Sequence, residues 1–237
     1  MFIITFANSK GGVGKSTACI SIAGAYAKAG ARVHIIDLDS NGTISRWLAD
    51  DAARPPHLTV SQSDPQLLAE HLQQIARDRA PDLCLIDIAG SYERALTFAV
   101  GRAHITILPV CPSSEADIFE AARVAKHIDA LFTAFDKGLP LYRLLATKVT
   151  TLPTFAQAHG FKEIRGLALP MFATTIAQRT AYEEVGYSGR PPHFAEPIRG
   201  TTAKAIAELD RLKRELDQLL NLAGEPADST PELQQTA

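Results

Sequence analysis

A glycine-rich loop near the start of the chain limits the possible folds more than any other feature. Residues 9–17 read Ser-Lys-Gly-Gly-Val-Gly-Lys-Ser-Thr. The loop follows the apolar run Phe2–Phe6 and leads at once into a helix-length stretch that begins at Lys15. Glycines let consecutive backbone N–H groups turn inward, and the start of a helix adds unpaired N–H donors with partial positive charge. This order of strand, loop and helix predicts a binding site for phosphate groups.

Two side chains of the loop fit that interpretation. Lys15 supplies a mobile ammonium for the outer phosphates of a nucleotide, and Ser16 supplies a hydroxyl for Mg²⁺. The general pattern has glycine where this chain has Ser9, and Lys10 is an addition to it. The alternative, a glycine turn that binds no nucleotide, fits the position between strand and helix less well.

The rest of the chain alternates short apolar runs with amphipathic stretches, which predicts an α/β fold: a mostly parallel β-sheet flanked by helices on both faces. The predicted strands are Phe2–Phe6, Val33–Ile36, Leu58–Ser61, Leu83–Ile88, Ile105–Val110 and Leu141–Ala146. The predicted helices are Lys15–Ala29, Pro65–Arg79, Glu93–Ala99, Glu115–Ala134 and Thr201–Leu222. Prolines interrupt residues 150–200, where we expect short helices and loops. We expect residues 1–223 to form a single domain and residues 224–237 to be a disordered acidic tail.

Composition excludes several classes of protein. Of the 237 residues, 46% are apolar and 21% are charged, and no stretch is apolar and long enough to span a membrane. Met1 leads directly into an apolar run without a basic region, so we expect no secretory signal and a cytoplasmic protein. The three cysteines, Cys19, Cys84 and Cys111, are widely spaced and form no CxxC pair, which predicts free thiols rather than disulfides or a metal site.

Three acidic residues stand at the ends of predicted strands. Asp37 and Asp39 follow one strand, and Asp87 ends another. The carboxyl ends of parallel strands form the edge where open α/β sheets bind ligands. We assign the attacking water to Asp39 and keep Asp37 with Ser16 and Asp87 as candidate magnesium residues. For both Asp37 and Asp39 the alternative is that the carboxylate only caps the next segment.

The segment Lys10–Thr17 resembles the deviant Walker A motif of the ParA/MinD family of P-loop ATPases. Ile35–Asp39 resembles the family's D-x-D strand end, and Leu83–Asp87 resembles its Walker B strand. The resemblance is good over about residues 1–130 and looser beyond them.

The resemblance implies a P-loop NTPase fold and a slow, switch-like ATPase that uses ATP and Mg²⁺. It implies a homodimer that sandwiches ATP, in which Lys10 reaches the partner's nucleotide. Lys15 would contact the β- and γ-phosphates, Ser16 the metal, Thr17 the α-phosphate, and Asp87 the metal through water. The nucleotide-binding residues are then Gly11, Gly12, Val13, Gly14, Lys15, Ser16 and Thr17, and the catalytic residues are Lys10, Lys15 and Asp39.

Some segments depart from the partition ATPases of that family. Residues 37–42 read Asp-Leu-Asp-Ser-Asn-Gly and are followed by Arg46-Trp47, a spacing similar to VirC-type proteins that assist conjugative DNA transfer. Trp47 also fits a core aromatic on a helix face. Beyond Asp87 and Ile88, the pair Ala89-Gly90 suits a switch turn that senses the γ-phosphate.

Two further family classes fit less well. Iron–sulfur relatives need cluster thiolates at a dimer interface, whereas Cys84 lies inside a predicted buried strand. A MinD-like membrane regulator needs a C-terminal helix with a basic polar face, whereas the last predicted helix mixes both signs of charge, so membrane binding is not expected.

Charge is uneven along the chain. Residues 137–223 hold 12 Lys and Arg against 8 Asp and Glu, a net +4. The candidate DNA-binding residues there are Arg165, Arg179, Arg190, Arg199, Lys204, Arg211, Lys213 and Arg214. They form no base-reading motif, and solvated surface is the alternative for each. The resemblance to the small ParA-type proteins implies non-specific DNA binding by the ATP dimer, association with the nucleoid, and partition or positioning of DNA. It also implies a centromere-binding protein that stimulates hydrolysis. The similarity to VirC-type proteins implies, as the alternative, recruitment of a relaxase complex in conjugative transfer.

Overall fold

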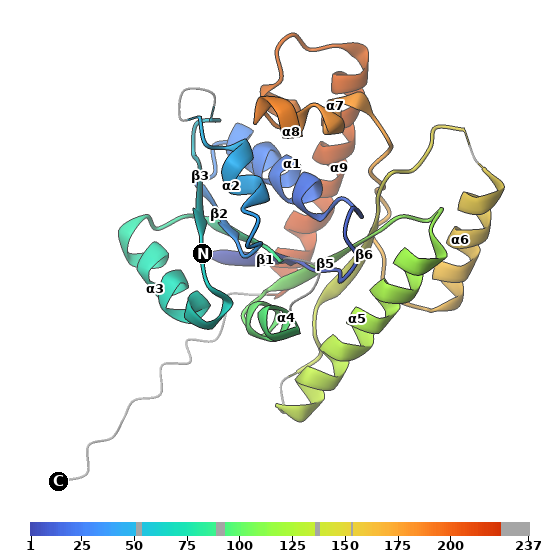
Figure 1. The fold of residues 1–237 in the computed structure, drawn as a ribbon, viewed down its shortest axis with the longest axis horizontal. Helices are drawn as coiled ribbons and strands as arrows, with labels where there is room; N and C mark the ends of the chain where they lie inside the picture. Colours follow the sequence, from blue (N-terminus) through green and yellow to red (C-terminus); the bar gives the residue numbers. More distant parts are fainter. Residues whose placement is uncertain (51–53, 89–92, 136–137, 153, 224–237) are drawn as a thin grey trace.

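The near-continuous apolar runs become the strands of one sheet. In this computed structural model, which describes residues 1–50, 54–88, 93–135, 138–152 and 154–223, six parallel strands pair in the order β3-β2-β4-β1-β5-β6 (Figure 1). The strands are β1 Phe2–Phe6, β2 Val33–Asp37, β3 Leu58–Gln62, β4 Leu83–Asp87, β5 Ile105–Val110 and β6 Tyr142–Ala146. Strands β1, β2, β4 and β5 are buried along their whole length or nearly so, because helices cover both faces.

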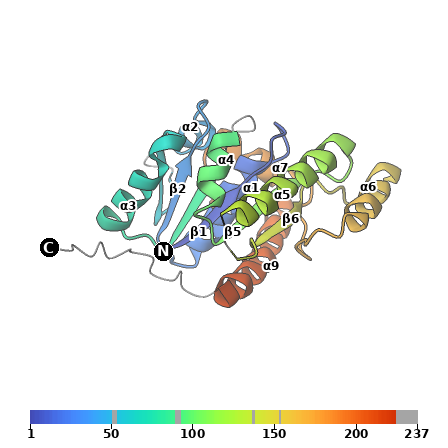
Figure 2. The same cartoon turned by 90° about the horizontal axis from the view of Figure 1, so that it is seen from below.

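The helices pack in two layers. They are α1 Lys15–Lys28, α2 Thr43–Trp47, α3 Leu68–Asp78, α4 Glu93–Val100, α5 Glu115–Ala134, α6 Phe155–Gly166, α7 Thr180–Glu183, α8 Val185–Ser188 and α9 Gly200–Ala223, with the 3₁₀ turns Pro65–Leu67 and Pro192–Phe194. One core joins α1 and α9 to the sheet, and the other joins α3, α4 and α5 to its opposite face. Both views in Figures 1 and 2 place α3 and α6 at opposite ends of the sheet.

The last helix is an integral part of the first core. Leu209, Leu212 and Leu216 of α9 are completely buried against α1 and the sheet. Burial of each such side chain contributes roughly 1.5–3 kcal/mol. This packing involves one face of the helix, which was predicted as Thr201–Leu222, and leaves its other face to solvent.

The α/β prediction is confirmed, and the strand bounds agree to within one residue at each end. Two helices differ from expectation. No helix was predicted for residues 43–47, and only short helices and loops were expected where α6 has 12 residues. Thr154 caps α6 by accepting from the Gln157 N–H, while Gly160 lets the helix approach the Pro112 carbonyl, which a Cβ at that position would meet at 1.8 Å. A glycine inside a helix lowers helix propensity, so only the close packing explains it.

Strand register brings the loop and the acids together. Asp37 of β2 pairs with Asp87 of β4, and Asp87 pairs with Phe6 of β1. The glycine-rich loop leaves β1 just beyond Phe6, so it stands beside both carboxylates at the carboxyl edge of the sheet.

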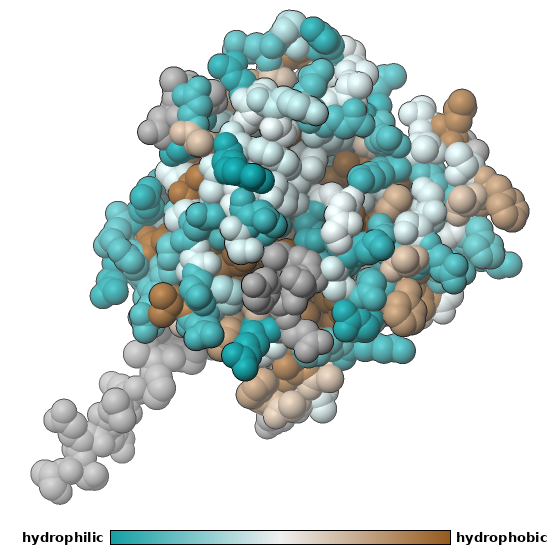
Figure 3. Space-filling view, in the orientation of Figure 1, coloured by the Kyte–Doolittle hydropathy of each residue, from teal (hydrophilic) through white to brown (hydrophobic). Residues whose placement is uncertain are grey.

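On the face that Figure 3 shows, most of the surface is polar, and apolar residues gather beside the start of α6 and at the lower end of α5. Phe155 is 88% exposed and Phe135 is 65% exposed. Within the part of the chain described above, no helix has both the length and the apolar character needed to cross a membrane.

Candidate functional site

The glycine-rich loop wraps the start of α1. Gly12 and Gly14 have backbone φ angles of 78° and 92°, which residues other than glycine rarely adopt. Gly14 is also the N-cap of α1, so the first N–H groups of that helix point into the loop. The local sequence therefore builds a loop with left-handed glycines at the start of a helix, the backbone geometry that an anion site requires.

Three side chains close the loop by donating to its carbonyl oxygens. Lys15 Nζ donates to Lys10 O at 2.9 Å, Thr147 Oγ1 to Val13 O at 2.8 Å, and Lys148 Nζ to Gly12 O at 2.6 Å. Burial lowers the pKa of Lys15, although nearby Asp87 and Asp39 oppose the shift.

Thr147 and Lys148 follow β6 and were not singled out from the sequence. Lys148 has a left-handed φ of 53°, a conformation that costs energy for a non-glycine residue and is common at functional sites. No short motif surrounds these two residues, so the sequence carries no signal for them.

Two cavities meet at the loop. The phosphate cavity, of about 560 Å³, is lined by Ser9, Gly11, Gly12, Gly14, Lys15, Ser16, Thr17, Asp39, Ser40, Asn41, Thr43, Trp47, Ile88 and Lys148. The adjoining pocket, of about 190 Å³, is lined by Gly14, Thr17, Ala18, Thr147, Lys148, Ile176, Ala177, Gln178, Arg179, Tyr182 and Glu183. Gly14, Thr17 and Lys148 belong to both, so one elongated ligand can occupy the two cavities together.

Asp87 has one satisfied and one unsatisfied oxygen. Ser16 Oγ donates to Asp87 Oδ2 at 2.6 Å, whereas Asp87 Oδ1 is buried and has no hydrogen-bond partner in the described structure. Burial raises the pKa of Asp87 to about 7, and Asp37 adds to the rise, while the Ser16 hydrogen bond and Lys15 lower it. An unpaired buried carboxylate oxygen beside a hydroxyl fits a divalent cation.

The described residues hold no cluster of three or more His, Cys, Asp or Glu side chains that could bind a metal by itself. Mg²⁺ is commonly held by one or two protein oxygens together with substrate phosphates and water. Ser16 and Asp87 are therefore the residues that would hold Mg²⁺ next to a bound nucleotide.

Asp37 and Asp39 have different surroundings, because β2 ends at Asp37 and Asp39 lies beyond the strand. Asp37 is buried, and its two oxygens accept from the backbone N–H groups of Asp39 at 3.1 Å and Ser45 at 3.0 Å. Both oxygens of Asp37 therefore hold the start of α2. This agrees with the alternative interpretation, in which the Asp37 carboxylate only caps the next segment. We do not place Asp37 in a metal site. Asp39 is half-buried, accepts from the Asn41 N–H at 2.9 Å, and lines the phosphate cavity.

Lys10 lies on the outside of its own loop. Its side chain is exposed and lines a third, shallow cavity with Ser9, Phe119, Glu120 and Arg123 rather than the phosphate cavity. Ser9 Oγ hydrogen-bonds to Glu120, and Arg123 Nε donates to the same carboxylate at 2.9 Å. A lysine directed away from its own phosphate site is available to a neighbouring molecule.

The candidate DNA-binding cations do not gather on one surface. Lys204, Arg211 and Arg214 share the solvent-exposed stripe of α9, and Arg199 directly precedes that helix. Arg165 is exposed on α6, at the end of the sheet near β6 (Figure 1).

The other three candidates are held in ion pairs. Arg179 pairs with Glu208 and its side chain is only 15% exposed. Lys213 pairs with Asp217 at 2.7 Å and lies over the Tyr26 ring, and Arg190 is 3.5 Å from Glu196. The contacts of Arg179 and Lys213 favour the structural interpretation over a DNA contact.

Two sequence-based alternatives can be compared with this geometry. Cys19 and Cys84 are buried free thiols, and burial raises the pKa of Cys84 to about 12, which suits an inert core residue. Trp47 is half-buried, packs against the first core and also lines the phosphate cavity. It is therefore both a core aromatic, as one interpretation predicts, and a residue of the candidate site.

The parallel sheet, the glycine-rich loop before α1 and the carboxylates at the same edge define a P-loop nucleotide-binding fold. The family described as the CobQ/CobB/MinD/ParA nucleotide binding domain matches residues 4–192, and the chain belongs to this family.

Several named relatives are similar over much of their length. The chain is 26% identical to the maintenance of carboxysome distribution protein A of Gloeobacter kilaueensis, over 91% of this chain and 94% of that protein. It is 24% identical to a ParA protein of Rhizobium radiobacter, over 87% of this chain and 91% of that protein. It is 26% identical to the virC1 protein of Rhizobium radiobacter, over 59% of this chain and 62% of that protein.

Solved structures show the same fold. The apo McdA structure from Cyanthece has a TM-score of 0.69 at 15% identity, covering 88% of this chain and 99% of that one. MinD in the MinC:MinD complex of Aquifex aeolicus has a TM-score of 0.69 at 19% identity, covering 92% and 96%. MinD of Pyrococcus horikoshii, solved with Mg-ADP, has a TM-score of 0.65 at 16% identity, covering 94% and 99%.

Proposed function

We propose that this protein is a slow, Mg²⁺-dependent ATPase whose ATP-bound state positions DNA. The observation that carries the proposal is the junction of the two cavities at Gly14, Thr17 and Lys148. A triphosphate in the phosphate cavity would direct its nucleoside into the adjoining pocket, whose lining includes the apolar residues Ala18, Ile176 and Ala177. Membership of a nucleotide-binding family supports the same ligand.

The loop residues divide the work of holding the nucleotide. The inward N–H groups of residues 11–14 and the Lys15 ammonium would bind the β- and γ-phosphates. Thr17, which lines both cavities, would contact the α-phosphate. Asp39 would orient the attacking water, because it lines the phosphate cavity and is not buried among backbone donors as Asp37 is.

Mg²⁺ bound at Ser16 and Asp87 would neutralise charge on the phosphates. Asp87 Oδ1, the buried oxygen without a described partner, would hold a water of the metal's shell. The Ser16 hydroxyl oxygen would bind the metal through a lone pair, while its hydrogen could still donate to Asp87.

Dimerisation would complete the site. Lys10 is exposed and lies outside the cavity of its own loop, so in a homodimer its ammonium could reach the nucleotide of the second copy. The ATP state would then be dimeric and the ADP state monomeric. The rate of ATP hydrolysis would therefore set the lifetime of the dimer.

The likeness to ParA and to a carboxysome-distribution protein supports partition or positioning as the role. The exposed cations Arg199, Lys204, Arg211 and Arg214 would contact DNA phosphates without reading sequence. Dimerisation would double these contacts and link DNA affinity to ATP. The partner would be a centromere-binding protein that stimulates hydrolysis, and the location would be the cytoplasm at the nucleoid.

A second function is supported by a separate observation. The similarity to virC1 over 59% of this chain, together with the Asp-Ser-Asn-Gly segment and Arg46-Trp47, favours recruitment of a relaxase–DNA complex in conjugative transfer. A MinD-like membrane role has less support, because the polar positions of α9 carry both signs of charge.

Sedimentation with ADP, with ATP, and with ATP plus DNA tests the proposal. We expect a monomer with ADP, a dimer with Mg-ATP, and a DNA complex only with Mg-ATP. The K15A variant is the matched control for nucleotide binding and should stay monomeric throughout. A wild-type chain that binds no ATP by calorimetry would overturn the ATPase proposal, and DNA binding that ignores nucleotide would overturn the switch.

A further inference from the structure

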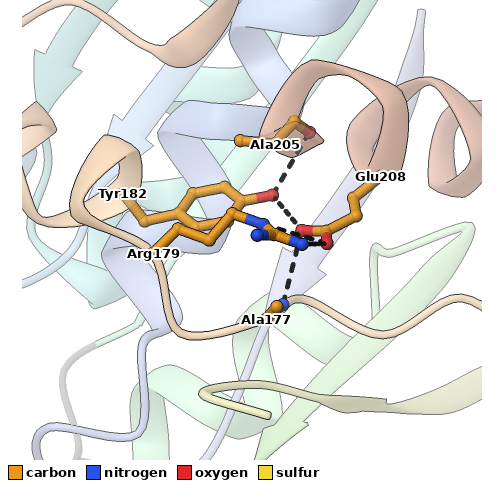
Figure 4. A network of polar contacts seen from close by, with 5 residues as sticks. All are labelled: Ala177, Arg179, Tyr182, Ala205 and Glu208. Carbon is orange, nitrogen blue, oxygen red and sulfur yellow. Dashed lines mark hydrogen bonds and ion pairs between the residues drawn. The ribbon is translucent and has the colours of Figure 1, made fainter. Parts of the chain in front are cut away.

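A carboxylate from the last helix holds the far wall of the adjoining pocket. Glu208 of α9 reaches the segment 176–183, whose residues Ala177, Arg179 and Tyr182 line the pocket opposite α1 (Figure 4). The phosphate loop takes no part in these contacts. The position of this pocket wall therefore depends on contacts with α9, a helix that lies far along the chain from the phosphate loop.

The groups that point at Glu208 are all donors. Arg179 Nε donates to Oε1 at 3.0 Å and Arg179 Nη2 donates to the same oxygen. The Ala177 N–H donates to Oε2 at 3.4 Å, and the Tyr182 hydroxyl lies 3.1 Å from Oε2 and 3.3 Å from the Ala205 carbonyl. The Glu208 side chain is only 8% exposed, so water cannot replace these partners freely. Burial raises the pKa of Tyr182, and Glu208 raises it further, which keeps the hydroxyl protonated as a donor.

Only a carboxylate satisfies this arrangement. A glutamine has one acceptor oxygen, and its NH₂ group would face either the Arg179 guanidinium or the Ala177 N–H and Tyr182 hydroxyl. Breaking a buried charge pair by removing one partner leaves the other charge uncompensated. The segment would then move to recover its hydrogen bonds, and the pocket wall would move with it.

We infer that Glu208 is a positioning residue for the base of the bound nucleotide: it fixes the wall of the adjoining pocket without touching the phosphates. This inference rests on the proposed ATP site. It predicts that Glu208 governs the part of the binding affinity that depends on the nucleoside, while the part that depends on phosphate belongs to the loop.

The chain provides a matched control on the same helix. Glu215, seven residues further along α9, accepts from the N–H groups of Ala173 and Thr174 at 2.8 Å and from the Thr174 hydroxyl. It holds the neighbouring stretch of chain at residues that do not line the pocket. E215Q and E208Q therefore make the same chemical change, and only one of them disturbs the pocket wall.

The test compares Mg-ATP with Mg-tripolyphosphate by calorimetric competition in the full chain. We expect wild type and E215Q to prefer ATP by the same factor, and E208Q to lose about tenfold of that preference with its tripolyphosphate affinity unchanged, since unsatisfied buried donors commonly cost this much. Thermal melting of each apo variant reports folding separately. Should E208Q not fold, Y182F keeps the ring and removes one donor, and we expect a smaller loss of the same kind.

The outcomes separate the two proposals. An unchanged preference in folded E208Q, or in Y182F if E208Q does not fold, overturns the role of Glu208 and leaves the ATPase proposal standing. An equal loss in E215Q shows a general effect of α9 and also overturns it. Equal binding of ATP and tripolyphosphate by the wild type shows that the pocket holds no base, and absence of ATP binding removes the proposed function itself.

Discussion

Ser16 and Asp87 are joined by a 2.6 Å hydrogen bond although 71 residues separate them in the chain. The bond links the first turn of α1 to the end of β4, two elements that share no local sequence signal. It leaves the second oxygen of Asp87 buried and without a described partner. The pair is the point where a P-loop hydroxyl and a sheet carboxylate meet, and these are the two side chains that we propose as the holders of Mg²⁺.

The first prediction concerns that pair. S16A should reduce the gain in ATP affinity that Mg²⁺ gives, because the metal loses one oxygen ligand, while affinity for metal-free ATP stays near the wild-type value. Calorimetric titrations with and without Mg²⁺ measure both quantities. S21A, a buried serine on the same helix, is the control. If S16A retains the full magnesium effect, the metal lies elsewhere.

K10A should bind Mg-ATP normally but fail to dimerise and to hydrolyse it. Lys10 is exposed and does not line its own phosphate cavity, so its loss removes only a contact with a second copy. Analytical ultracentrifugation and a phosphate-release assay measure the two effects, and K162A on the exposed side of α6 is the control. Normal dimers and turnover in K10A would contradict the sandwich arrangement.

D39A should bind ATP and dimerise, yet hydrolyse ATP at least about a hundredfold more slowly, because loss of a general base or water-orienting group commonly costs this much. Single-turnover hydrolysis together with dimer lifetime is the measurement. D37N provides the comparison: Asp37 accepts from two backbone N–H groups around the start of α2, so this change should lower stability more than rate. If D37N slowed hydrolysis and D39A lowered only stability, the attacking water would be assigned to Asp37 instead.

Charge reversals on α9 should reduce the salt dependence of DNA binding. The double variant K204E/R211E changes two exposed cations of one helix stripe, and the log–log slope should fall by about 0.9 for each phosphate that is no longer neutralised. R77E/R79E at the end of α3 makes the same change in net charge at exposed positions on the opposite face of the sheet and is the control. DNA affinity against salt for the ATP dimer, on two unrelated duplexes, is the measurement. Equal effects of both variants, or preference for one duplex, would contradict a non-specific surface on α9.

His34 should make folding stability depend on pH. It is completely buried on β2 between the hydroxyls of Thr59 at 2.7 Å and Ser61 at 2.8 Å. Burial lowers its pKa to about 4, and Arg79 and His71 contribute. Between that pKa and the unfolded value of about 6.5 the unfolded chain binds more protons at this residue. The contribution of His34 to the free energy of unfolding is therefore complete above about pH 6.5 and falls as the pH falls towards 4, by up to about 3 kcal/mol.

Denaturant unfolding from pH 4 to 7 measures this dependence. H34Q should be less stable at pH 7 but should show a flatter slope across the window. H159Q, at an exposed position on α6, should keep the wild-type slope. A wild-type slope in H34Q would show that other groups carry the dependence.

Much of the fold follows from the sequence, because its signals are local. Runs such as Phe2–Phe6 and Ile105–Val110 bury both faces of a strand, and the observed bounds of these two agree with the predicted ones. The α6 helix was not predicted, because Gly160 and the prolines nearby reduce the helical signal and its packing partner Pro112 is distant in sequence. The expected acidic tail and the Ala89-Gly90 switch lie outside the described residues, so both stay predictions.

The sequence by itself determined the phosphate loop, the start of α1 and the acids at the strand ends. Backbone N–H direction and strand alternation depend on neighbouring residues, so a short motif is enough to define them. The tertiary structure alone decided that Lys148 closes the loop from 136 residues away, that Arg179 is held by Glu208, and that Asp37 holds the start of a helix while Asp39 faces the cavity. These contacts depend on which strands become neighbours and on which side chains burial forces to find partners, and no local pattern encodes that choice.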